Sequence, residues 1–139
     1  MNMKVTEIFA EETYDLRSEV MWPDKSQNFV VLEDDKEGVH FGLWKDDKII
    51  SVISLFIKGN EAQFRKFATA ILEQGYGFGT ILLKHLMTFV VDKKINRLWC
   101  NARADKVSFY ESFGMRQTSQ SFKKGGIRYI IMEKHSQTI

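Results

Sequence analysis

The chain has 139 residues, of which 44% are hydrophobic and 27% charged, and its formal net charge is +2. This length allows one domain that buries roughly two-thirds of its unfolded surface, so we expect a single domain over residues 1–139. No apolar run reaches the length of a membrane span, no long basic tract suggests nucleic acid, and the single cysteine, Cys100, excludes an internal disulfide. The composition predicts a cytoplasmic protein whose partners include neither a membrane nor a nucleic acid.

The small net charge hides an uneven distribution along the chain. Residues 1–70 carry nine Lys/Arg against thirteen Asp/Glu, a net −4, whereas residues 71–139 carry eleven against five, a net +6. An anionic ligand would favour the second half and a cationic ligand the first. Scattered solvated charges explain so small an imbalance equally well.

The chain opens with a predicted strand and helix. Residues 4–9 have the pattern of a short strand, and residues 11–22 that of a helix with acidic residues in its first turn. The only proline, Pro23, ends this helix. Residues 24–38 are polar, acidic and irregular, which predicts a loop.

An antiparallel meander of three strands is predicted next, at residues 39–44, 48–58 and 61–70. A polar cluster at residues 45–47 and the pair Gly59-Asn60 provide the two turns. The middle strand is almost continuously apolar, which is typical of a strand covered on both faces.

The second half of the chain predicts two helices and three strands. A largely apolar helix over residues 80–92 leads to a strand at 97–101, which such a crossover places parallel to the strand before it. A second helix covers residues 105–113 and is ended by Gly114. Strands at 115–122 and 127–134 finish the chain as a hairpin around residues 123–126.

The segment between the third strand and the long helix reads Gln74-Gly75-Tyr76-Gly77-Phe78-Gly79. Glycine permits positive φ angles and close backbone approach, and the helix N-terminus behind it adds a positive dipole end. This combination predicts a site for a phosphorylated ligand. Neither the dinucleotide fingerprint G-x-G-x-x-G nor the triphosphate loop G-x-x-x-x-G-K-[ST] is present.

The positions of Gln74, Gly77 and Gly79 match Q/R-x-x-G-x-G/A, which resembles the pyrophosphate-binding segment of the GCN5-related N-acetyltransferases (GNATs). A second stretch, Phe109-Tyr110-Glu111-Ser112-Phe113-Gly114-Met115, is similar to that family's F-Y-x-x-x-G-F. The resemblance covers about residues 38–134. It implies an α/β (α+β) fold with a mixed, mostly antiparallel sheet of about seven strands, splayed between the fourth and fifth and flanked by about four helices.

The resemblance also implies the activity, namely transfer of an acetyl group from acetyl-CoA to a primary amine by direct attack in a ternary complex. Tyr110 would then stand beside the thioester sulfur. The family's cofactor contacts fall on Phe67, Ala68, Thr69, Gln74, Gly75, Tyr76, Gly77, Phe78, Gly79, Thr80 and Asn101. No metal is expected, because three widely separated histidines offer no ligand spacing.

Several points stay open at the level of sequence. Glu61, Glu73 and His40 are candidate bases by position, although each is more often a surface or core-rim residue than a base. The acidic 24–38 loop would border the acceptor pocket, together with Trp22 and Trp44. A non-catalytic acyl-CoA-binding or sensing domain on the same fold is the alternative function. A homodimer through the edge of the strand at 127–134 is a further expectation.

Overall fold

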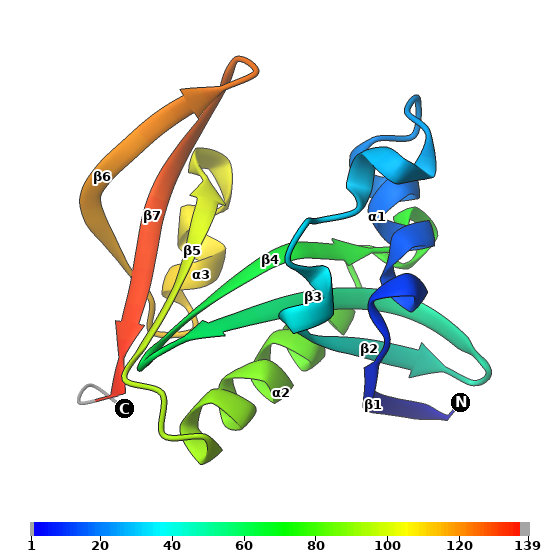
Figure 1. Cartoon of the computed structure of the whole chain (residues 1–139), viewed down its shortest axis with the longest axis horizontal. Helices are drawn as coiled ribbons and strands as arrows, with labels where there is room; N and C mark the ends of the chain where they lie inside the picture. Colours follow the sequence, from blue (N-terminus) through cyan, green and yellow to red (C-terminus); the bar gives the residue numbers. More distant parts are fainter. Residues whose placement is uncertain (1, 137–139) are drawn as a thin grey trace. The chain divides into compact units, whose positions relative to one another are not determined.

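The structure is a computed structural model that describes residues 2–136. Within them, seven strands form a mixed sheet in the order β1-β2-β3-β4-β5-β7-β6, accompanied by three α-helices (Figure 1). The strands are β1 (Met3–Ile8), β2 (Val39–Lys45), β3 (Lys48–Lys58), β4 (Glu61–Thr69), β5 (Arg97–Arg103), β6 (Arg116–Lys124) and β7 (Ile127–His135). The helices are α1 (Tyr14–Met21), α2 (Phe78–Asp92) and α3 (Val107–Glu111). This is the mixed, mostly antiparallel architecture that the sequence predicts, with three α-helices where about four were expected.

The described residues divide into two compact units. One comprises residues 2–56 and 65–89, and the other comprises residues 57–64 and 90–136. Strand β4 contributes its first four residues to the second unit and the rest to the first. Its pairing with β5 is parallel, as predicted, and joins Glu61–Gln63 to Arg97–Trp99.

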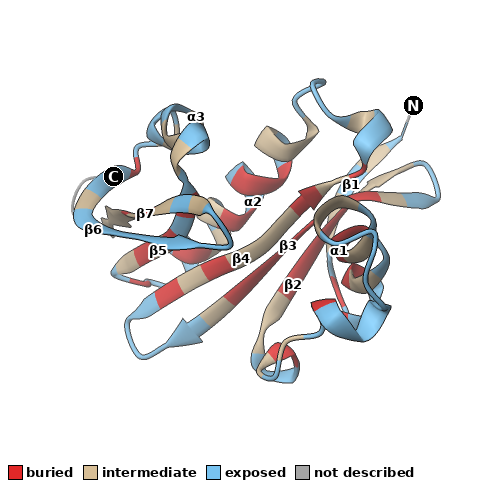
Figure 2. Cartoon of the chain, turned by 90° about the horizontal axis from the view of Figure 1, so that it is seen from above, coloured by how far each residue is buried: buried red, intermediate tan, exposed pale blue. Residues whose placement is uncertain are grey.

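In the first unit, β1 pairs antiparallel with β2, and β2 with β3. Strand β3 is buried without interruption from Ile50 to Leu55, which confirms the prediction from its apolar run (Figure 2). The buried stretch includes two hydroxyls, Ser51 and Ser54, both of which make hydrogen bonds. The predicted 11–22 helix is divided into a 3-10 turn at Ala10–Thr13 and the shorter α1.

The second unit contains the C-terminal hairpin, whose two strands β6 and β7 pair antiparallel. Strand β7 lies between β5 and β6, so the expectation that residues 127–134 form an exposed sheet edge is wrong, and β6 is the outer strand. Most β6 residues are exposed, as an edge position requires (Figure 2). The hairpin turn is also shorter than expected, because Gly125 (φ 59°) and Gly126 (φ 78°) form a two-residue turn and Lys124 still belongs to β6.

Helix α3 is shorter than the predicted 105–113 helix, since a 3-10 turn at Ala104–Lys106 precedes it. Gly114 has a φ of 87° and follows the last turn, the role expected of a glycine that ends a helix. None of the helices within residues 2–136 is long and apolar enough to cross a membrane.

Candidate active site

The predicted phosphate site lies where the chain enters α2. Gly75 and Gly77 have φ angles of 87° and 84°, a conformation that side-chain-bearing residues rarely adopt. A Cβ at either position would meet nothing within 4 Å, so the turn is open on this side. The first hydrogen bond of the helix runs from the Ile81 N–H to the Gly77 carbonyl (3.2 Å). The amides that precede Ile81 in the first helical turn therefore have no intrahelical acceptor. The turn therefore offers backbone donors and a helix dipole end to an anion.

Gly79 is a glycine for a different reason. Its φ is ordinary, but a Cβ there would lie 3.2 Å from Cζ of Phe67 and 3.6 Å from the Thr69 hydroxyl. The glycine thus lets the start of α2 pack closely against β4, the strand expected to contact the cofactor.

The end of β4 is shaped by contacts within the first unit. Lys66 adopts a left-handed conformation (φ 55°) inside the strand, which is uncommon for a residue with a side chain. Beyond it, the Ser51 hydroxyl lies 2.8 Å from Oγ1 of Thr69 and 3.3 Å from the Ala68 carbonyl. Gln74, expected to donate to a pyrophosphate, donates from Nε2 to the Thr69 carbonyl at 3.0 Å. Its side chain therefore fastens the glycine turn to the strand.

Tyr110, on α3 in the second unit, is half-buried among aromatic rings. Its ring centroid is 5.7 Å from that of Phe64 and 5.2 Å from that of Phe109. Burial, and secondarily Cys100, raises the pKa of the Tyr110 phenol well above its usual value. The phenol therefore stays protonated at neutral pH and can donate a hydrogen bond.

Two neighbouring residues of β5 have contrasting environments. Burial raises the pKa of Cys100 to about 12, so its thiol is a core group and no nucleophile at neutral pH. Asn101, a predicted cofactor contact, is exposed and pairs in register with Ile131 of β7.

Each of the three candidate bases is engaged by another group. Glu61 accepts a hydrogen bond from Arg97 (2.8 Å), and Glu73 accepts one from Lys45 (2.9 Å). His40 is buried and uses both ring nitrogens in hydrogen bonds. The sequence gives no sign of these contacts, because the partners of Glu61 and Glu73 lie 36 and 28 residues away.

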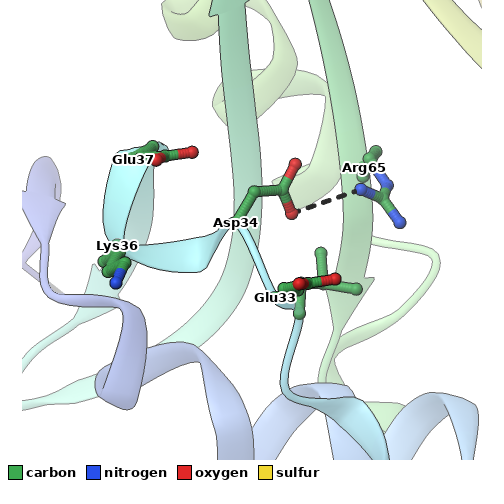
Figure 3. Close-up of a pocket in the computed structure, with 6 residues that line it drawn as sticks. Glu33, Asp34, Lys36, Glu37 and Arg65 are labelled. Atoms are coloured by element: carbon green, nitrogen blue, oxygen red, sulfur yellow. Dashed lines mark ion pairs between the residues drawn. The ribbon is translucent and has the colours of Figure 1, made fainter.

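A pocket of about 600 Å³ opens beside the acidic loop of the first unit (Figure 3). Five of its lining side chains are charged, and the lining consists of Leu32, Glu33, Asp34, Lys36, Glu37 and Arg65. Arg65 reaches it from β4 and lies 3.6 Å from the Asp34 carboxylate. The acidic loop, expected to border an acceptor pocket, does line this pocket, and Arg65 is a lining residue that the sequence did not suggest. Trp22 and Trp44, expected beside the loop, are not among these lining residues. Whether the acceptor binds here stays a prediction.

Comparison with known proteins places this chain in a family. Residues 8–136 match the model of the acetyltransferase (GNAT) domain. The uncharacterized N-acetyltransferase YitI of Bacillus subtilis (strain 168) is 27% identical over 146 residues, covering 98% of each protein.

Solved structures show the same fold. Escherichia coli ElaA superposes with a TM-score of 0.82 at 15% identity, covering 96% of this chain and 100% of that one. A GNAT family acetyltransferase from Elizabethkingia anophelis, solved with acetyl-CoA bound, superposes with a TM-score of 0.75 at 18% identity, covering 96% and 98%. Because its matched residues span nearly the whole chain, this protein belongs to the GNAT family and is an acyltransferase.

Proposed function

We propose that this protein is an acetyl-CoA-dependent N-acetyltransferase that acetylates a primary amine by direct attack within a ternary complex. The observation that carries the proposal is the open glycine turn before α2, whose backbone donors suit a pyrophosphate. The Elizabethkingia anophelis relative, which has acetyl-CoA bound, supports the same ligand for this chain.

The residues of the turn fit that ligand chemically. Between Gln74 and Thr80 the chain carries no acidic side chain, and the adjacent Glu73 is neutralised by Lys45. Amides from Gly75 to Thr80 would hold the pyrophosphate, with little side-chain interference from Gly75 and Gly77. The backbone of Phe67, Ala68 and Thr69 would pair with the pantetheine arm as an added strand does, and Asn101 would hydrogen-bond the arm.

In the proposed reaction the amine nitrogen attacks the thioester carbonyl, a C–N bond forms, and the C–S bond breaks. The electrons of that bond leave on the sulfur, so a donor beside the sulfur lowers the barrier. Tyr110 is our choice for this donor, because its raised pKa keeps the phenol protonated. Its role is a hydrogen bond to the forming thiolate, since the phenol is a weaker acid than a thiol.

We place the acceptor in the pocket beside the acidic loop. Arg65 lines the pocket and precedes Phe67 by two residues on β4, so the pocket and the cofactor strand share one element. The carboxylates of Glu33 and Glu37 would attract a protonated amine. The amine must also lose a proton, and the candidates for removing it are Glu61, Glu73 and a water chain. Glu61 already accepts a hydrogen bond from Arg97, and Glu73 accepts one from Lys45.

Two measurements test the proposal. Isothermal titration with acetyl-CoA and with free coenzyme A should show binding of both, and primary amines should then release thiol from acetyl-CoA. Absence of binding at millimolar cofactor would contradict the proposal. Binding without turnover on any amine would instead support an acyl-CoA-binding or sensing domain. Residence in the cytoplasm and assembly as a homodimer stay predictions, tested by fractionation and by light scattering.

A further inference from the structure

A fully buried arginine lies beneath residues 32–37, the segment that forms one wall of the proposed acceptor pocket. Arg17, on α1, is 0% exposed and makes a two-bond ion pair with Asp35, with both N–O distances at 2.8 Å. It also donates to the Val30 carbonyl (3.0 Å) and to the Ser54 hydroxyl (2.9 Å). A charge so far from water needs all of these partners to be tolerated.

The partner of Arg17 belongs to the segment that forms the pocket. Asp35 lies between Asp34 and Lys36, whose side chains line the pocket, but its own carboxylate is turned inward. It also accepts the Leu32 N–H at 2.8 Å, and the Asp35 N–H donates to the Leu32 carbonyl at 3.1 Å. The ion pair therefore fastens the wall from its buried side.

A second contact holds Asp35 through its backbone carbonyl, which His40 reaches. The Asp35 carbonyl can only accept, so Nε2 of His40, 2.7 Å away, must carry the proton. Nδ1 of the same ring lies 2.7 Å from the Ser54 hydroxyl, which also accepts from Arg17. Arg17, Ser54, His40 and Asp35 therefore form one closed hydrogen-bond network.

This network involves none of the side chains that line the pocket. Replacing a buried ion pair by apolar residues of similar volume is often neutral or stabilising, so stability alone is a weak reason to keep one. What the pair supplies is a fixed geometry for a loop whose exposed side chains are all flexible and charged. We propose that Arg17 and Asp35 are positioning residues, which hold the Leu32–Glu37 wall in the shape that recognises the acceptor. This inference rests on the proposed function of the pocket.

The test is a double variant, Arg17→Met with Asp35→Leu, which removes both charges and leaves neither unpaired. The probe is the amine that wild-type protein acetylates fastest among spermidine, lysine amide, tyramine and glucosamine. We expect the KM for that amine to rise by about tenfold, with the coenzyme A Kd and the kcat each within about twofold to threefold of wild type. A purely structural role would instead reduce the active fraction, which lowers kcat and leaves the amine KM unchanged.

The matched control makes the same substitutions at the exposed pair Arg103 and Asp105, 3.8 Å apart, and should change neither constant. If the double variant fails to fold, Ser54→Ala removes one hydroxyl from the network and should still raise the amine KM. An unchanged amine KM in an active variant overturns the positioning role alone. A wild-type protein that binds coenzyme A but acetylates none of the amines overturns the proposed function, and this inference with it.

Discussion

Replacing Gly77 by alanine tests whether the glycine turn holds the cofactor through its backbone. The φ of Gly77 is 84°, and a Cβ there would meet no atom within 4 Å. The substitution therefore introduces no clash within the protein, and its effect on the free protein comes from the backbone. Alanine either keeps the positive φ under strain or lets the turn relax and rotate its peptide planes.

Both effects can be estimated. A residue with a side chain loses about 1–2 kcal/mol in the left-handed region. With an unfolding entropy of about 2.1 cal/mol/K per residue, this strain lowers the Tm of a 139-residue chain by roughly 3–7 °C. If the turn relaxes, at least one amide turns away from the pyrophosphate. A hydrogen bond to a charged group contributes about 1.5–3 kcal/mol, so the coenzyme A Kd should rise roughly 10- to 150-fold.

Gly125 supplies the matched control. Its φ is 59°, a Cβ there also meets nothing within 4 Å, and it lies in the hairpin turn between β6 and β7. Gly125→Ala should lower the Tm by a similar amount and leave the coenzyme A Kd unchanged. Calorimetric titration with coenzyme A and thermal unfolding of both variants give the result. If Gly77→Ala unfolds at the wild-type Tm, which shows that the turn has relaxed, and still binds coenzyme A as tightly as Gly125→Ala does, the idea that the backbone of this turn anchors the cofactor is refuted.

Three further predictions concern titratable groups. Tyr110→Phe should lower kcat by about tenfold or more while the coenzyme A Kd stays near wild type, since it removes only the donor to the thiolate; equal turnover would exclude Tyr110 from the reaction. Cys100, with a pKa raised to about 12, should react slowly with a thiol reagent in native protein and rapidly in urea, and fast native labelling would contradict its burial. Desolvation raises the pKa of Asp35, but hydrogen bonds from Arg17 and the Leu32 amide outweigh it, so the native pKa lies below the unfolded value. The stabilisation from the ionised Asp35 carboxylate is present above the unfolded pKa, near 4, and is lost as the pH falls below it. The unfolding free energy should therefore fall more steeply below pH 5 in wild type than in Asp35→Asn. Parallel curves would contradict the lowered pKa of Asp35.

The parts of the fold that the sequence predicts correctly depend on local patterns. The apolar run of β3 predicts a strand covered on both faces, and residues 50–55 are buried. Gly114 predicts the end of a helix, and its φ is 87°. The order of β6 and β7 could not be found in this way, because either strand of a hairpin can pair with β5 and only tertiary packing selects one. The separation of β4 from β5 beyond Gln63 and Trp99 stays a prediction, as does the single domain over residues 1–139.

The acidic loop shows why the acceptor side was harder to predict. Glu33, Asp34, Asp35 and Glu37 look alike in the sequence, yet Asp35 is buried and the other three line the pocket. The Asp35 carboxylate instead accepts the Leu32 N–H and two hydrogen bonds from Arg17, contacts that no local sequence pattern predicts. Its partner, Arg17, is 18 residues away on α1, where nothing distinguishes it from a solvated arginine.

The two halves of the proposed reaction are therefore encoded in different ways. The cofactor would be bound by backbone amides of a contiguous turn, in which Gly75 and Gly77 adopt positive φ angles that glycine tolerates without strain. The acceptor would be met by side chains, and the network proposed to position them joins distant segments, such as Arg17 and Ser54, 37 residues apart. A motif can reveal the first kind of site, because the determinants are contiguous. The second kind is determined only once the chain has folded, because its determinants lie far apart in the sequence and meet only in the tertiary structure.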